Sequence, residues 1–332
     1  MRAAISSIAS STPSGLFREQ LASHRTARAV GAAAGLAAGG LFYSTVIERN
    51  AFTLRHATMS VLEPGAAPLR VLHISDLHMM PNQRLKQAWV SELESFEPDL
   101  VVNTGDNLSH LQAVPHALEA LKPLLERPGV FVMGSNDYYA PTPKNPGRYL
   151  TKDYAKVVAE RVALPTEELR SGMTDAGWVD LDNARTSLHL GGQRIDLVGV
   201  DDPHIERDDY ASVSAPAAAD ATTVGVAHAP YQRVLDAMTA DGARLVIAGH
   251  THGGQLCVPG YGALVTNCDL DRGRAKGVSR WWPGAGTSTP RPSDAAWLHV
   301  SAGLGASRYA PVRFACRPEA TLMTLVPEGL DR

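Results

Sequence analysis

The chain has 332 residues, of which 44% are hydrophobic, so it is long enough to bury a large core. Its formal net charge of −3 provides no overall basic field, which disfavours nucleic acid as a partner. The three cysteines lack the spacing of a metal site. We expect Cys257, Cys268 and Cys316 to be packing residues or free thiols, unless export allows two of them to pair.

The N-terminus divides into two segments. Residues 1–28 are rich in Ser and Ala and are predicted to be flexible, and residues 29–47 follow without a charge and are long enough to span a bilayer. Because this uncharged run is mostly Ala and Gly, both a membrane anchor and a signal helix fit it. We expect membrane association through this segment, by a single-pass anchor or by export, with a soluble cytoplasmic form as the alternative.

From residue 70 onward, predicted strands and helices alternate. Residues 83–96 carry apolar side chains at near-helical spacing, and Pro98-Asp99 ends this helix before the next strand, which indicates a βαβ unit. Further helices are predicted at 116–126, 152–163 and 166–176, a strand at 178–181, a hairpin over 186–200, and closing strands of a second sheet at 297–301 and 321–326.

A basic segment at residues 271–294 contains the pair Trp281-Trp282. Basic residues beside paired Trp suit an interface with anionic lipid headgroups. The alternative, which we favour, is that the Trp pair packs on the domain while the charges are solvated.

Five apolar runs each end in polar side chains that can bind metals. The runs at 71–75, 100–104, 130–133, 224–227 and 245–248 lead, in order, into Asp76 and His78, Asp106, Ser135 and Asn136, His228, and His250 and His252. In layered α/β proteins the carboxyl ends of buried strands gather ligands at one place. Two His at i and i+2 on extended backbone also project to the same side. The sequence therefore predicts a metal site at these strand ends.

In chain order these motifs resemble the calcineurin-like metallophosphoesterase superfamily, which reads D-x-H, G-D, G-N-H-D/E, a lone His and G-H-x-H. The resemblance spans roughly residues 69–326, and residues 74–78 and 249–255 are similar to the bacterial membrane-associated phosphoesterase branch. It implies a catalytic domain at 66–328 with a four-layer αββα sandwich, in which helices flank two mixed β-sheets. It also implies a phosphoester substrate, of the phospholipid-like phosphodiester class in this branch.

The resemblance implies two divalent ions, Mn, Fe or Zn, bridged by Asp106. Asp76, His78 and His252 would complete the shell of the first ion, and Asn136, His228 and His250 that of the second. Two ions roughly 3.5–4 Å apart can clamp a phosphoryl group, and a hydroxide that bridges them would attack phosphorus. Asp106 and His250 are therefore the candidates for a direct part in catalysis.

One position departs from the family pattern, because Ser135-Asn136 stands where relatives have Asn-His. We favour Asn136 as the metal ligand over Ser135, since an amide oxygen binds a hard cation better than a neutral hydroxyl does. The missing His is thought to stabilise the phosphate or protonate the leaving oxygen. Either His204 or a metal-bound water is a candidate to replace it, although His204 is equally well explained as a loop residue without a role. For Asp201 and Asp202 we favour turn chemistry over support of the site.

Three functions are compatible with these motifs. The first is a dinuclear phosphodiesterase acting on a lipid or cell-envelope molecule. The second is a soluble phosphomonoesterase or nucleotidase, and the third is a catalytically weak metal-binding regulatory module. Retention of all the other ligands argues against the third.

Overall fold

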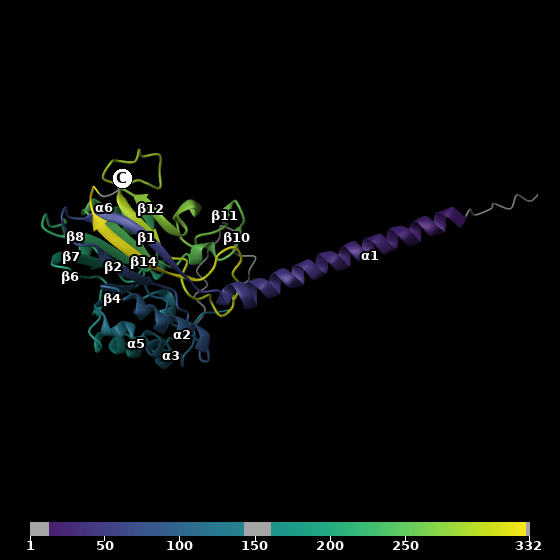
Figure 1. Cartoon of the computed structure of the whole chain (residues 1–332), viewed down its shortest axis with the longest axis horizontal. Coiled ribbons are helices and arrows are strands. Elements are labelled where there is room, and N and C mark those ends of the chain that lie inside the picture. Colours follow the sequence, from purple (N-terminus) through teal and green to yellow (C-terminus); the bar gives the residue numbers. More distant parts are fainter. Residues whose placement is uncertain (1–12, 143–160, 330–332) are drawn as a thin grey trace, which may run out of the picture. The chain divides into compact units, whose positions relative to one another are not determined.

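The computed structural model describes residues 13–142 and 161–329, with side chains from residue 27 onward. The predicted helix at 152–163 therefore lies mostly outside the described residues, as do residues 1–12 of the segment expected to be flexible. The chain divides into two units, Met1–Ser44 and Thr45–Arg332 (Figure 1).

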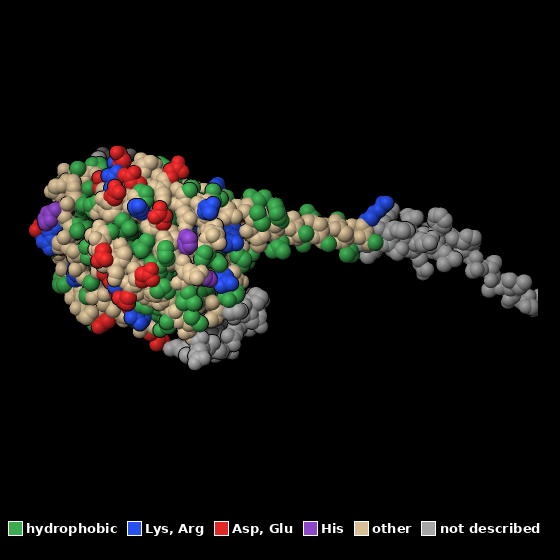
Figure 2. All heavy atoms as spheres, turned by 90° about the horizontal axis from the view of Figure 1, so that it is seen from below, with side chains coloured by type: hydrophobic (Ala, Val, Ile, Leu, Met, Phe, Trp, Pro, Cys, Tyr) green, Lys and Arg blue, Asp and Glu red, His purple; other side chains and the backbone are tan. Residues whose placement is uncertain are grey.

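The first unit consists largely of one helix, α1 (Pro13–Phe42), which begins on the N-terminal side of residue 29. Figure 2 shows hydrophobic side chains along its described length, with cationic atoms at its start. By length and composition, Ala27–Asn50 could cross a bilayer, and a signal segment would meet the same criterion.

Two six-stranded mixed sheets form the framework of the second unit. The first has the order β1 (Thr53–Leu62), β14 (Glu319–Pro327), β2 (Leu69–Ile74), β3 (Leu100–Asn103), β4 (Gly129–Phe131) and β5 (Val179–Asp180). The second has the order β12 (Gly277–Trp281), β13 (Ala296–Val300), β9 (Leu245–Ala248), β8 (Thr222–Ala227), β7 (Gln193–Gly199) and β6 (Ala184–Leu190). A separate hairpin pairs β10 (Cys257–Val258) with β11 (Gly262–Ala263).

The sheets pack face to face because their central strands are apolar on both sides. In β2, Val71 faces the core between the sheets, where Val226 and Ile247 of the second sheet also lie, whereas Leu72 faces the helices outside. The outer face of the first sheet is covered by α2 (Arg84–Glu92), α3 (Val114–Leu121) and α5 (Thr166–Thr174), and α6 (Gln232–Ala240) covers the second (Figure 1). This is the αββα sandwich that the motifs indicated.

Two strands differ from the sequence analysis, and one favoured interpretation holds. Strand β1 precedes residue 66 yet pairs in parallel with β14, and β14 lies in the first sheet between β1 and β2 rather than closing the second. Trp281 is fully buried against α6, and its indole N–H donates to Asp236 Oδ1 at 2.8 Å. Trp281 thus packs on the domain, as the favoured interpretation expected.

Candidate metal centre

The predicted ligands lie at the carboxyl ends of strands from both sheets. Asp76 and His78 follow β2, Asp106 follows β3, and His250 and His252 follow β9. All five have positive φ, between 42° and 69°, a backbone region that residues other than Gly rarely adopt. Such conformations persist only where the surrounding fold imposes them, and they cluster at functional sites.

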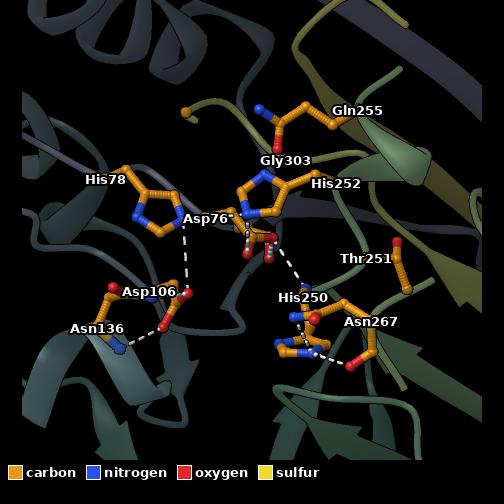
Figure 3. A network of polar contacts seen from close by, with 12 residues as sticks. Asp76, His78, Asp106, Asn136, His250, Thr251, His252, Gln255, Asn267 and Gly303 are labelled. Atoms are coloured by element: carbon orange, nitrogen blue, oxygen red, sulfur yellow. Dashed lines mark hydrogen bonds and ion pairs between the residues drawn. The ribbon is translucent and has the colours of Figure 1, made fainter. Parts of the chain in front are cut away.

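One group of candidate ligands is compact. The ligand atoms of Asp76, His78, Asp106 and His252 all lie within 4.8 Å of one another. Nε2 of His78 is 3.1 Å from Nε2 of His252 and 3.5 Å from Oδ2 of Asp106 (Figure 3). Asp76 Oδ1 lies 3.6 Å from His252 Nε2 and is buried without a hydrogen-bond partner. This group offers two imidazoles and two carboxylates, and one carboxylate oxygen is buried without a partner. Such a set of ligand atoms fits a divalent cation.

A second group lies on the other side of Asp106. Asp106 Oδ1 is 3.5 Å from His228 Nε2, which is 3.2 Å from His250 Nδ1. Asn136, on the short helix α4 (Ser135–Tyr138), donates from its backbone N–H to Oδ1 and from its side-chain amide to Oδ2, both at 2.7 Å. Asp106 therefore contacts residues of both groups.

Charges in the site are strongly coupled. Burial raises the pKa of Asp76 to about 6. Burial alone would also raise the pKa of Asp106, but His228 and His78 lower it to about 2. Burial lowers the pKa of His78 to about 4 and that of His252 well below its ordinary value. Near neutral pH these two imidazoles are therefore uncharged and keep lone pairs that can bind a cation.

His228 carries the opposite shift. Burial opposes a charge on its ring, but Asp106, Asp202 and Asp76 together raise its pKa to about 9. Its Nδ1 contacts the Thr104 carbonyl oxygen at 2.7 Å, which directs Nε2 toward Asp106. The His228 ring is thus oriented as in a metal-binding His, with one nitrogen held by a backbone carbonyl and the other directed toward the site.

A buried polar chain supports Asp76 from between the sheets. Ser75 Oγ donates to Asp76 Oδ2 at 2.5 Å, and Thr104 Oγ1 donates to Ser75 Oγ at 2.7 Å. Nε2 of His73 lies 2.9 Å from Thr104 Oγ1, and its Nδ1 lies 3.0 Å from Nδ1 of His299. Burial lowers the pKa of both rings, that of His299 to about 4. The carboxylate of Asp76 is thereby held in one orientation.

Asp137 joins the loop that carries Asp106 to α4. Its Oδ1 accepts from the backbone N–H groups of Asn107 and Leu108, at 2.7 and 3.2 Å, and its Oδ2 accepts from Gly134 at 3.0 Å. It occupies the acidic position that ends the family's third motif. Of the two residues before it, Asn136 is the one whose side chain contacts Asp106.

The loop after β7 places His204 beside the candidate ligand His250. The ring centroid of His204 is 4.5 Å from that of His250, and its Nδ1 lies 3.0 Å from the Tyr231 hydroxyl. Asp202 accepts from the His204 backbone N–H at 2.8 Å, which is the turn chemistry we favoured, while its Oδ2 is buried without a partner. Asp201 accepts from the Asp202 backbone N–H at 2.7 Å and also binds the Tyr138 hydroxyl and Arg207, at 2.9 and 2.8 Å.

The loop at residues 301–305 belongs to the site and escaped the sequence analysis. A Cβ on Gly303 would lie 2.5 Å from the Cβ of Asp76, so only glycine fits there. Gly305 donates to the Asp76 carbonyl at 2.6 Å. The glycine-rich run after the predicted strand at 297–301 was a signal that could have identified this loop.

Arg313 also escaped the sequence analysis. It is fully buried, donates to the carbonyls of Ala302 and Gly303 at 2.7 and 3.1 Å, and lies 3.4 Å from His252 Nδ1. Apart from a bond to the Cys316 carbonyl at 3.3 Å, these contacts join residues that are distant in the sequence, so no local pattern marked Arg313.

The buried His pair predicts acid sensitivity. Above pH 6.5 His299 is neutral in the folded and the unfolded chain, but between pH 6.5 and about 4 only the unfolded chain binds the proton. The free energy of unfolding should therefore fall as the pH drops through this window, by up to about 3 kcal/mol for His299. Urea unfolding at pH 7, 5.5 and 4.5 should show a shallower pH dependence in His299→Gln than in the wild type. The exposed His189→Gln serves as the control, and equal slopes in His299→Gln and the wild type would contradict this account.

Comparison with known proteins agrees with this geometry. The family model for the calcineurin-like phosphoesterases matches residues 69–254, more than half of the chain. YkuE, an uncharacterized metallophosphoesterase of Bacillus subtilis (strain 168), is 26% identical over 307 residues, which cover 90% of this chain and 93% of YkuE. Phosphodiesterase YaeI of Escherichia coli (strain K12) is 25% identical over 295 residues, which cover 86% of this chain and 93% of YaeI.

A third relative is named as a transmembrane protein. The transmembrane protein with metallophosphoesterase domain of Bos taurus is 26% identical over 224 residues, which cover 62% of this chain and 45% of that protein. With its family model, its relatives and a candidate metal-binding cluster in agreement, the chain belongs to the calcineurin-like phosphoesterase family and is a metal-dependent hydrolase of phosphoesters.

Proposed function

We propose that the protein hydrolyses a phosphodiester with two divalent ions held on opposite sides of Asp106. One observation carries the proposal: Asp106 Oδ2 faces His78 and Oδ1 faces His228, each at 3.5 Å. A carboxylate with an imidazole at each oxygen is suited to bridge two cations and to offset their repulsion.

Each ion would have a mixed set of nitrogen and oxygen ligands. Asp76, His78 and His252 are the ligands proposed for the first ion, and Asn136, His228 and His250 those for the second. Such sets suit Mn, Fe or Zn. Divalent ions in this arrangement supply charge stabilisation for the phosphoryl group and a nucleophile at neutral pH, because they acidify water.

His204 is our candidate for protonation of the leaving oxygen. Neither Ser135 nor Asn136 can carry out the acid role that the missing His has in relatives. The contact of the His204 ring with that of His250, at an interplanar angle of 48°, and its contact with the Tyr231 hydroxyl support this role, because both hold the ring beside the proposed site.

Three observations support a membrane-associated phosphodiester as the substrate class. Residues 27–50 are long and apolar enough to cross a bilayer, and one relative is named a transmembrane protein. The relative YaeI is named a phosphodiesterase. We therefore propose a lipid or cell-envelope phosphodiester rather than a soluble phosphomonoester.

The bridging role predicts the effect of changing Asp106. Asp106→Asn should lower bound metal well below the wild-type content. It should also reduce Mn-supported turnover of bis(4-nitrophenyl) phosphate by more than about a hundredfold. Loss of a residue that only hydrogen-bonds a metal ligand already lowers metal affinity or activity by about 10–100-fold. Asp201→Asn, whose carboxylate binds Tyr138 and Arg207, should keep most of the metal. Metal analysis showing equal loss in both variants, or a wild type that prefers 4-nitrophenyl phosphate, would refute the proposal.

The ligand choice at the variant motif predicts a difference between two neighbours. Asn136→Ala should bind about half the metal of the wild type, because the second ion loses a ligand and Asp106 loses a donor at 2.7 Å. Ser135→Ala should keep the full metal content. The reverse result in metal analysis would identify Ser135 as the ligand.

The role of His204 predicts a dependence on the leaving group. His204→Asn should slow hydrolysis of alkyl phosphodiesters by about 10²–10⁴-fold, while esters of acidic phenols should be affected much less. The measurement is the slope of log kcat against leaving-group pKa in wild type and variant, with His189→Asn as the control. An unchanged slope with unchanged metal content would exclude His204 as the acid.

A further inference from the structure

The β10–β11 hairpin lies outside both large sheets (Figure 1). Several residues in and next to it have exposed apolar side chains. In the described part of residues 45–332, more than half of the exposed large hydrophobic residues belong to this group, with exposed fractions between 36% and 61%. We call the group the apolar surface; it consists of Val46, Ile47, Leu256, Val258, Tyr261, Leu264, Val265 and Phe314. Monomeric soluble proteins rarely expose large contiguous apolar patches, and those that do use them for binding.

The hairpin itself is firmly built into the domain. Cys257 pairs with Ala263, and both are buried in a small cluster with Cys316. The outward positions are therefore occupied by Val258 and Leu256, because neighbours along a strand face opposite sides. The exposure of these side chains is thus imposed by the way the hairpin packs.

Phe314 connects the hairpin to a second part of the surface. It pairs with Leu256 in an isolated bridge, and its backbone N–H donates to the Gln255 carbonyl at 3.1 Å. The next two residues, Ala315 and Cys316, donate their backbone N–H groups to the carboxylate of Glu48, at 3.0 and 2.6 Å. Glu48, only 2% exposed, therefore fixes the end of the candidate membrane span beside Phe314.

This connection indicates which partner the surface fits. Val46 and Ile47 lie within the span at 27–50 and directly precede Glu48. Because the buried Glu48 is bound to the backbone next to Phe314, a bilayer that held the apolar residues before Glu48 would end near Phe314. The surface is therefore continuous with the segment that would enter the membrane.

Cationic and aromatic side chains at its border suit a lipid headgroup layer. The exposed Arg272 guanidinium lies 5.1 Å from the centroid of the Tyr261 ring. Lys276 and Arg317 are exposed as well, and Arg317 Nε donates to the Ala51 carbonyl at 2.8 Å, just past the end of the span. Tyr at the interface and Lys or Arg beside anionic headgroups are the residues that such a layer favours.

We propose that the apolar surface rests on the anionic leaflet of the bilayer in which residues 27–50 are anchored. The turn η8 (His252–Gly254), which begins with a proposed metal ligand, is followed within two residues by Leu256. The surface would thus hold the metal centre next to the membrane, and this part of the argument rests on the proposed membrane-borne phosphodiester.

The test uses the full chain in vesicles of phosphatidylcholine and phosphatidylglycerol with brominated acyl chains, which quench Trp fluorescence on contact. Tyr261→Trp should add a Trp signal that these lipids quench, relative to the parent chain. His189→Trp, on the exposed edge strand β6, should add a signal that they do not quench. In the Tyr261→Trp background, Leu256→Ser, Val258→Ser and Leu264→Ser together should abolish the quenching, whereas Phe96→Ser should not. No quenching at position 261 in the folded, vesicle-bound chain would overturn the proposal.

Two further measurements separate the possible failures. Turnover of bis(4-nitrophenyl) phosphate should be unchanged in the triple Ser variant, because the soluble ester does not need the bilayer. Inactivity of the parent chain would refute the proposed phosphodiesterase while leaving the quenching result to decide on the surface. A dimer in detergent that the triple variant loses, with no quenching at position 261, would identify a second copy of the chain as the occupant and reject the membrane.

Discussion

A charged carboxylate in the interior is costly unless partners of opposite charge and hydrogen-bond donors surround it. Asp106 is such a carboxylate, nearly inaccessible to solvent, with imidazoles at both oxygens and two donors from Asn136. Asp106 and the neutral His78 both follow strands of the first sheet, whereas His228, whose pKa is raised to about 9, follows a strand of the second. The opposite charge therefore reaches Asp106 only when the two sheets meet. The inter-sheet packing and the candidate metal centre therefore depend on the same contact.

Close contacts and left-handed backbone constrain both the residue types and the conformation of the loops around Asp106. A Cβ on Gly134 would lie 2.4 Å from Asp106 Oδ1, so the glycine of the third motif is required by the close approach of α4 to the carboxylate. The left-handed backbone of five candidate ligands adds strain at the same place. The buried hydrogen bonds that link His299 to Ser75, and those that Asp137 accepts from the loop after Asp106, hold these conformations. Many polar groups beside the site are therefore buried.

The metal centre and the apolar surface share one short segment. Residues 252–256 begin with a candidate ligand and end with an exposed leucine, and the backbone of Phe314 pairs with this segment on its other side. Cys316 links the same region to Glu48, at the end of the candidate membrane span. The candidate ligand His252 and the exposed Leu256 are thus held by the same short stretch of backbone.

Local patterns in the chain were sufficient for the strand ends and for most of the candidate ligands, because a buried strand followed by Gly, Asp or His leaves a short and regular signature. They were also sufficient for the αββα class, through the resemblance that the ordered motifs carry. They could not reveal that β1 pairs with β14, since that contact joins residues such as Thr53 and Glu319 from opposite ends of the chain. The same reason applies to Arg313, to the loop at 301–305 and to the burial of Trp281, which are decided by packing against distant elements. At Ser135-Asn136 the sequence left two alternatives, and only the three-dimensional fold brought the Asn136 amide, rather than the serine hydroxyl, into contact with Asp106.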